Sequence, residues 1–206
     1  MSGCCDNDSA AEALRDNQRG TLIAVLAINA TMFFVMVIAA QFAKSTALFA
    51  DSLDNFGDAM TYALSLMVIA SGIRAKAKVA LFKGCLILMA GLVVLSQIGY
   101  KLLYPETPIF ELMGFFSLVA LVANSLCLAL LWRHRNEDIN MSSVWECSRN
   151  DIATNISVFV AAGAVWFFEA GWPDVIVASA LVILLLQSSA RVISSAIKEL
   201  QPATEA

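Results

Sequence analysis

The segment Ala50-Asp-Ser-Leu-Asp-Asn-Phe-Gly-Asp58 places three carboxylates inside residues 45–72, a stretch otherwise apolar enough to form a membrane helix. An ionised carboxylate in the hydrocarbon core costs roughly 2.5–3.5 kcal/mol on insertion scales. Asp51, Asp54 and Asp58 stand at i, i+3 and i+7 and therefore share one face of a helix. A chain tolerates such charges where they face protein, water or a cation, so this segment predicts a membrane helix with a site on one face.

A second pair with the same four-residue spacing, Cys147 and Asp151, opens the apolar run 152–168. If the two helices run in opposite directions, Asp58 is expected level with Cys147, and Asp54 level with Asp151. Four such ligands suit tetrahedral zinc, which takes thiolate sulfur at about 2.3 Å and carboxylate oxygen at about 2.0–2.2 Å. A thiolate also favours soft ions such as cadmium over magnesium, calcium or manganese.

These four residues are the predicted metal ligands: Asp54, Asp58, Cys147 and Asp151. Single acids near helix ends often cap the helix or contact lipid headgroups, and Asp51 is interpreted in that way. Asn55 and Asn155 each adjoin a proposed ligand and are expected to supply supporting hydrogen bonds.

The composition predicts an all-α membrane protein. The 206 residues are 59% hydrophobic and 15% charged, with a mean hydropathy of +0.74. A membrane helix needs about 20 apolar residues, and six runs are near or above this length, although the fifth is short. The runs are 21–42, 45–72, 80–100, 109–132, 152–168 and 175–197. We expect a tail at 1–19, a six-helix domain at 20–200 and a short tail at 201–206.

Basic residues predict the orientation of these helices. All but two of the 13 Lys and Arg residues fall on one side of the six-helix topology, and the exceptions are Lys44 and Lys101. Because cytoplasmic loops are enriched in Lys and Arg, both termini are expected in the cytoplasm.

The five cysteines do not predict a disulfide framework, and we expect reduced thiols. Cys4 and Cys5 are adjacent in a polar segment, residues 1–20, that is expected to be irregular. The alternative is a loose metal-capturing arm, because thiolates bind divalent ions. Cys85 and Cys127 are interpreted as small residues of the membrane core.

Turn and cap signals divide the helices. Residues 74–83 are basic and predict an internal turn, and Tyr104-Pro-Glu-Thr-Pro108 predicts an external loop. Ser143-Val-Trp-Glu146 has the spacing of a capping box and predicts the start of the fifth helix. Its polar first half is what a water-filled cavity needs. Gly171-Trp-Pro-Asp174 predicts a tight turn into the sixth helix.

Two stretches carry a family resemblance. Ser45-Thr-Ala-Leu-Phe-Ala-Asp-Ser-Leu-Asp-Asn-Phe-Gly-Asp-Ala59 resembles the helix-two signature of the cation diffusion facilitator family. Asn150-Asp-Ile-Ala-Thr-Asn-Ile-Ser-Val-Phe-Val-Ala-Ala162 resembles its helix-five signature, and Pro173-Asp174 before an apolar helix resembles its sixth. The likeness covers roughly residues 18–200. It implies export of zinc and related divalent ions from the cytoplasm in exchange for protons, usually by a homodimer.

In this resemblance the family's ligand positions fall on Asp54, Asp58, Cys147 and Asp151. Two departures stand out. The family's usual His on helix five is Cys147 here, which favours cadmium or another soft ion. The family's usual cytoplasmic C-terminal domain is absent from these residues, so the chain resembles a short member with the transmembrane domain alone.

The expected function is therefore a zinc- or cadmium-type exporter, a metal/proton antiporter with one tetrahedral site. The metal is cargo, no prosthetic group is expected, and the expected setting is a bacterial inner membrane. Partners would be metal ions, protons and lipid, with a homodimer as the family's usual assembly and no nucleic acid.

Other functions fit the residues less well. A metal sensor or accessory subunit would use the same ligands without transport. An intramembrane protease is disfavoured, because Phe56-Gly57-Asp58 supplies only part of a Gly-x-Gly-Asp pattern and Asp151 lacks the matching Tyr. No enzyme activity is expected. A passive channel would not need four convergent ligands.

Overall fold

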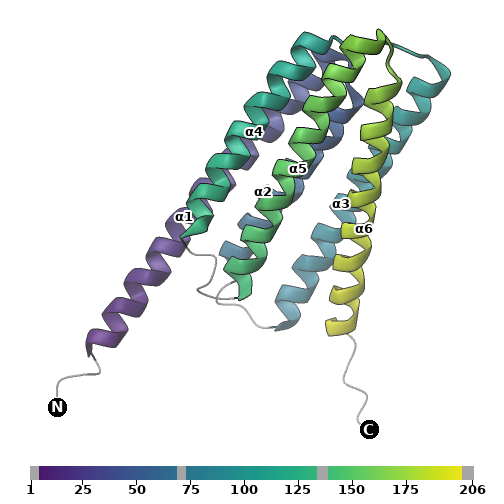
Figure 1. The fold of residues 1–206 in the computed structure, drawn as a ribbon. Helices are drawn as coiled ribbons and strands as arrows, with labels where there is room; N and C mark the ends of the chain where they lie inside the picture. The colour runs from purple at the N-terminus through teal and green to yellow at the C-terminus, as the bar shows by residue number, and fades with distance from the viewer. Residues whose placement is uncertain (1–4, 69–72, 134–138, 201–206) are drawn as a thin grey trace.

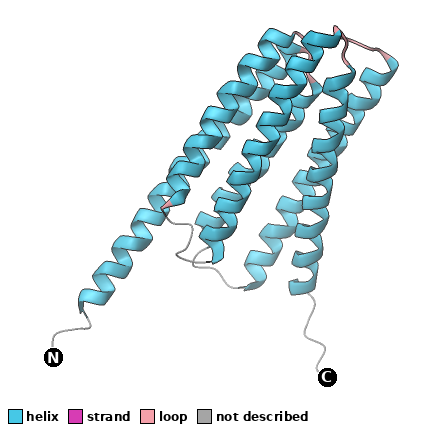
Figure 2. Cartoon of the chain, in the orientation of Figure 1, coloured by secondary structure: helices cyan, strands magenta, loops and turns pink. Residues whose placement is uncertain are grey.

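The structure, a computed structural model, describes residues 5–68, 73–133 and 139–200. Within these ranges the side chains at 5–18, 65, 67–68, 73–76, 79 and 139–147 are not described. The described residues form six helices and no strand (Figure 2). The helices are α1 (Cys5–Ala43), α2 (Thr46–Val68), α3 (Ile73–Leu103), α4 (Phe110–Trp132), α5 (Ile139–Phe168) and α6 (Trp172–Leu200).

The helices run along one common axis, and the two termini lie at the same end (Figure 1). We call this the termini end and its opposite the far end. At the far end the turn between α1 and α2 is very short, with Lys44 in the left-handed region at φ 53°. A chain that crosses a membrane six times must have both termini on the same side. That this side is the cytoplasm stays a prediction.

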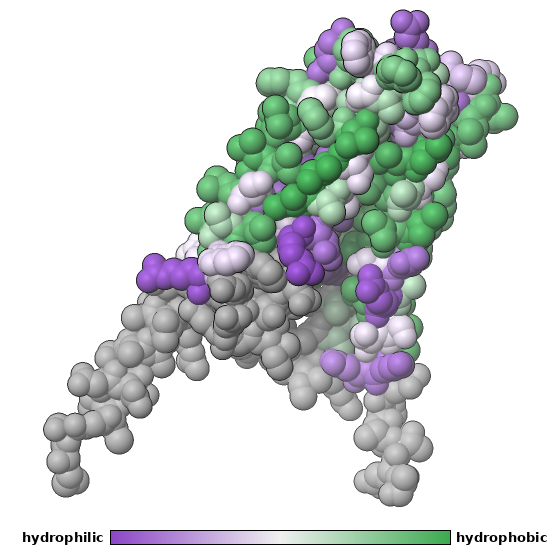
Figure 3. All heavy atoms as spheres, viewed as in Figure 1, coloured by the Kyte–Doolittle hydropathy of each residue, from purple (hydrophilic) through white to green (hydrophobic). Residues whose placement is uncertain are grey.

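The outer surface suits a lipid environment. Large apolar side chains such as Phe34, Phe115 and Phe167 are exposed, and a hydrophobic band covers much of the visible face (Figure 3). Five of the described helices are long and apolar enough to cross a membrane, and α2 is the exception because of its three aspartates. The prediction of an all-α membrane protein is confirmed.

The exceptional helix is also the central one. Within the described residues, α2 packs against all five other helices, and no other helix does so. A helix that carries Asp51, Asp54 and Asp58 cannot face lipid without a large desolvation cost. Its apolar neighbours therefore shield it on every side, which places the carboxylates inside the bundle.

Two helices begin earlier than expected. The segment expected to be irregular, residues 1–20, is helical from Cys5 onward, so that expectation is wrong for the described part. The predicted basic turn at 74–83 is also wrong, because α3 already begins at Ile73. Both stretches are rich in strong helix formers such as Ala, Lys, Arg and Glu. Hydropathy detects apolarity and not helix propensity, so it missed them.

The other boundaries differ by smaller amounts. Helix α5 begins at Ile139, so the predicted start at Ser143 is wrong and the capping-box residues lie within the helix. At 30 residues, α5 is about 45 Å long and includes the expected polar first half. Helix α6 begins at Trp172 and not after Asp174, because proline is tolerated in the first turn of a helix. Helix α3 ends at Leu103, before Pro105, as predicted.

Helices α3 and α6 pack closely through two glycines. A Cβ atom added to Gly84 would lie 2.6 Å from Ile193 Cγ1, and one added to Gly91 would lie 2.9 Å from Leu186 Cδ2. The Ser189 hydroxyl donates a hydrogen bond of 2.8 Å to the Gly84 carbonyl oxygen. Small residues let two membrane helices approach each other, and the seven-residue spacing repeats the contact along the pair.

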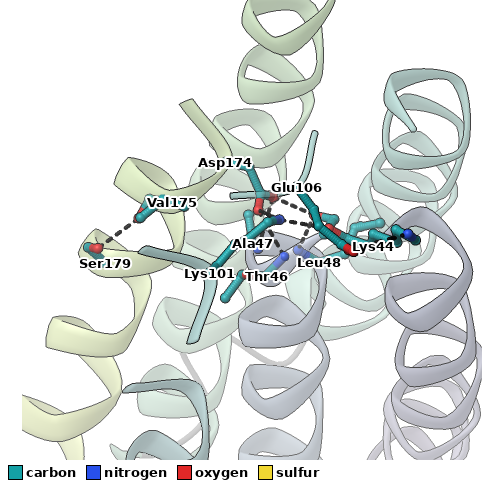
Figure 4. A network of polar contacts seen from close by, with 10 residues as sticks. Lys44, Thr46, Ala47, Leu48, Lys101, Glu106, Asp174, Val175 and Ser179 are labelled. Carbon is teal, nitrogen blue, oxygen red and sulfur yellow. Dashed lines mark hydrogen bonds and ion pairs between the residues drawn. The ribbon is translucent and has the colours of Figure 1, made fainter. Parts of the chain in front are cut away.

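At the far end, Asp174 of α6 caps the N-terminus of α2 (Figure 4). Its carboxylate accepts hydrogen bonds from Ser45 Oγ at 2.5 Å, from the Thr46 amide at 2.9 Å and from the Ala47 amide at 3.1 Å. The first amides of a helix lack partners within the helix and favour a negative group nearby. A residue distant in sequence thus satisfies the start of the central helix.

A buried cation completes this network. Lys101 Nζ at the end of α3 lies 2.8 Å from Asp174 Oδ2 and donates a second hydrogen bond of 2.7 Å to the Lys44 carbonyl oxygen. Asp174 and Lys101 are buried, whereas the neighbouring pair of Lys44 and Glu106 is exposed. The network joins the far ends of α1, α2, α3 and α6.

Replacing Asp174 by Ala should lower the free energy of unfolding by about 3–5 kcal/mol, because it leaves the Lys101 ammonium buried without its anion. Unfolding in mixed micelles, followed by circular dichroism, measures this change. Glu106→Ala is the matched control at the same end, and it should change stability by no more than about 1 kcal/mol. Equal losses in the two variants would show that Asp174 has no special structural role.

Candidate metal site

The three aspartates of α2 line one face in the middle of the bundle. Asp51 and Asp58 are buried, and Asp54 is partly buried. Their carboxylates are close enough for Asp54 to interact electrostatically with both neighbours. Three acids at this spacing concentrate negative charge in a region from which lipid is excluded.

Helix α5 brings a fourth carboxylate to the same place. Asp151 is buried, and its carboxylate lies near that of Asp58 of α2, with which it interacts electrostatically. Its next strongest electrostatic neighbour is Asp54. Side chains lean toward the N-terminus of their own helix, so on antiparallel helices these two carboxylates lean toward each other. The structure thus brings Asp58 and Asp151 together across two helices 93 positions apart in sequence.

Two neighbouring carboxylates constrain the chemistry of this site. They repel each other when both are ionised, and a proton or a cation between Asp58 and Asp151 relieves that repulsion. A divalent cation would neutralise the same two groups without that proton. The arrangement is therefore suited to an exchange of one for the other.

Two asparagines hold the backbone beside these acids. Asn55 Nδ2 donates a hydrogen bond of 3.0 Å to the Asp51 carbonyl oxygen, and Asn155 Nδ2 donates one of 2.7 Å to the Asp151 carbonyl oxygen. The Oδ1 atoms of both asparagines are buried and have no partner among the described residues. Asp51 Oδ2 is also buried and has no partner among the described residues. The sequence interpretation of Asp51 as a residue that contacts lipid headgroups is therefore wrong.

Unpaired buried oxygens are costly, and native sites satisfy them with protein, water or ions. Here three such acceptors, from Asp51, Asn55 and Asn155, belong to the two helices that also carry Asp58 and Asp151. The region has an excess of oxygen acceptors over donors. That imbalance is typical of a place that receives a cation or its hydration water.

Cys147 is the one predicted ligand whose side-chain surroundings the structure does not describe. It lies in the first half of α5, but its side chain falls outside the described residues. Among the side chains that are described, no three His, Cys, Asp or Glu residues form a group that could hold a metal ion as they stand. The four-ligand set of Asp54, Asp58, Cys147 and Asp151 therefore stays a prediction. The Cys4 and Cys5 side chains also lie outside the described part.

A cavity of about 410 Å³ opens elsewhere, at the far end between α1, α2 and α3. Lys44, Lys101 and Glu106 lie on its wall, and none of the described ligand candidates Asp54, Asp58 and Asp151 does. The cavity thus belongs to the region of the Asp174 network and is separate from the buried aspartates.

Sequence reasoning missed several polar partners. The sequence marks Lys101 as a basic residue and Asp174 as part of a turn and of the sixth-helix resemblance, and neither pattern predicts that the two form a buried pair. Asn29, in the middle of an apolar run, is buried and hydrogen-bonded to Cys127. A polar residue inside a membrane helix was the available signal, since such residues are rare and usually have a function.

The chain is also similar to a known protein family. The family model described as the cation efflux transmembrane domain matches residues 22–201, which include α1 from Leu22 onward and the whole of α2 to α6. A search of curated proteins gave no match.

The contact between α2 and α5 can be tested without any metal. In a chain whose native cysteines are replaced by Ser, we expect Asp58→Cys with Asp151→Cys to form a disulfide on mild oxidation, because the two side chains are neighbours across α2 and α5. Peptide mass spectrometry measures the yield. The control is Asp58→Cys with Ser157→Cys, since Ser157 is exposed on α5. Similar yields from the two pairs would contradict the placement.

Proposed function

The chain belongs to the cation diffusion facilitator family and is a membrane transporter of cations; from this premise we propose that it exports soft divalent metal ions, zinc or cadmium, in exchange for protons. The observation that carries the proposal is the contact between Asp58 and Asp151, which joins the two helices that bear the predicted ligands. The proposed site lies between α2 and α5 and consists of Asp54, Asp58, Cys147 and Asp151.

The charge inside the bundle supports a cation as cargo. Asp51, Asp54, Asp58 and Asp151 interact electrostatically with one another, and the buried Lys101 is engaged by Asp174 at the far end. Like charges gathered in a lipid-excluded region are stabilised by protons or by a cation. A divalent ion supplies two positive charges at one point, which suits a cluster of this kind.

Proton exchange follows from the same groups. A carboxyl or thiol must lose its proton to bind a metal ion, so metal binding releases protons and protonation releases metal. Asp58 and Asp151 are electrostatic neighbours, and a proton on either one relieves the repulsion between them. A site that opens alternately to each side would then carry metal one way and protons the other, and an inward proton gradient would drive export.

Opening the site alternately to each side requires two groups of helices to move relative to each other. Helices α3 and α6 form the most extensive pair in the bundle, and α3 otherwise contacts only α2 among the described helices. The glycine contacts at Gly84 and Gly91 hold that pair together. We propose that α3 and α6 move as one unit relative to the helices that hold the metal.

No enzyme activity is proposed for the buried acids. Asp51, Asp54, Asp58 and Asp151 exceed the two carboxyl groups that an intramembrane protease requires, and binding of a cation accounts for their clustering. The proposed partners are metal ions, protons and the lipid bilayer, and the proposed location is a bacterial inner membrane.

The test is metal-driven proton movement in sealed proteoliposomes. With cadmium or zinc outside and a pH-sensitive dye inside, the unaltered chain should show metal-dependent proton flux. Asp58→Asn and Asp151→Asn should each reduce the flux by more than about 100-fold, because loss of a supporting residue alone typically costs 10–100-fold. The control is Glu111→Gln, which removes an exposed acid in the first turn of α4. Metal binding without flux in the unaltered protein would favour a sensor.

The identity of residue 147 should set metal preference. Replacing Cys147 by His exchanges a soft thiolate for a borderline imidazole, so the ratio of cadmium to zinc transport should fall by about tenfold. Transport rates for the two metals in the same vesicles give this ratio. An unchanged ratio would mean that Cys147 does not contact the transported ion.

A further inference from the structure

A buried polar contact joins α1 and α4 beside the aspartates. Asn29 is 2% exposed, and its Nδ2 atom donates hydrogen bonds to the Val25 carbonyl oxygen at 3.0 Å and to Cys127 Sγ at 3.7 Å. Its Oδ1 atom is buried and has no partner among the described residues. The amide thus lies against the sulfur with an unused acceptor.

Cys127 is 1% exposed and close to the predicted metal site. Its thiol interacts electrostatically with Asp58 of α2. Tyr62, one turn beyond Asp58, packs with Cys127 and Leu131 in a small core cluster. These residues lie toward the termini end of their helices, since α2 and α4 both run from the far end to the termini end.

Packing alone does not explain why an asparagine occupies position 29. A buried amide oxygen without a donor lowers stability, and an apolar residue at position 29 would avoid that cost. The expectation that Cys127 is only a small core residue accounts for its burial and leaves the unpaired Asn29 oxygen unexplained. A cation between the two side chains would use the oxygen and the sulfur together.

We propose that Cys127 Sγ, Asn29 Oδ1 and the Asp58 carboxylate form a second binding position for a soft divalent cation. It adjoins the proposed position between Asp58 and Asp151 and lies on its termini side. A sulfur, an amide oxygen and a carboxylate favour zinc or cadmium over magnesium or calcium. The ion displaces the thiol proton to solvent as the metal–sulfur bond forms.

Asp58 belongs to both positions, and this gives the second position a role. A carboxylate has two oxygens and can release an ion on one side while holding it on the other. An ion bound at Cys127 and Asn29 therefore passes to Asp151 without leaving Asp58. This role rests on the proposed export function, whereas the binding itself does not.

Zinc X-ray absorption of a protein that retains only Cys127 tests the binding. The other four cysteines, Cys4, Cys5, Cys85 and Cys147, are replaced by Ser. We expect one zinc–sulfur contact at about 2.3 Å, which disappears when Cys127→Ser is added. The matched control retains only Cys85, which is exposed on α3, and should show no sulfur contact. A shell of oxygen and nitrogen alone in the Cys127-only protein would overturn the proposal.

Transport assays separate this proposal from the export function. In the native chain, Cys127→Ser and Asn29→Leu should each raise the KM for cadmium about tenfold with proton exchange retained. Exchange without any zinc–sulfur contact would reject the second position and leave the export function standing. A zinc–sulfur contact without exchange would do the reverse. The Cys127-only protein keeps the buried thiol, so the binding test does not depend on the folding of Cys127→Ser.

Discussion

The cost of placing carboxylates in a membrane governs this structure. Asp51, Asp54 and Asp58 make α2 unsuited to contact lipid, and α2 is the described helix that touches all five others. The apolar residues of its neighbours face outward and form the hydrophobic surface of Figure 3. The order of the bundle thus follows from the need to enclose one helix.

Enclosure alone would not fix the position of α2 along the bundle axis. The far-end network supplies that restraint, because Asp174 holds the first amides of α2 and Lys101 neutralises Asp174 (Figure 4). Asp51, Asp54 and Asp58 lie about one to three helical turns along α2 from the amides that Asp174 holds. A fixed far end would let the bundle open at the termini end, as the proposed transport cycle requires.

The sequence predicted the fold class, the helices and the pairing of α2 with α5 because each depends on local patterns. Hydropathy and the four-residue spacing of Asp54 with Asp58 and of Cys147 with Asp151 were sufficient for these. The helical start of α1 and the early start of α3 were missed, because charged helix formers resemble loops on a hydropathy scale. The contacts between Asp174 and Lys101 and between Asn29 and Cys127 depend on packing between distant helices, and no local pattern encodes it.

The two buried asparagines make the supporting hydrogen bonds that the sequence predicted. Asn55 and Asn155, interpreted from sequence as supports, do bond to the backbone one turn before them. Their unpaired oxygens and that of Asp51 add information that spacing could not give. Together they indicate a polar interior with more acceptors than donors, built on the two helices of the proposed site.

The position of a bound metal ion tests the proposed site most directly. Crystals of the protein grown with cadmium, measured at a wavelength where cadmium scatters anomalously, would locate the ion. The proposed site predicts a peak between α2 and α5 within bonding distance of Asp58 and Asp151, absent in Asp151→Asn. A peak only at the surface, or an unchanged peak in that variant, would contradict the assignment.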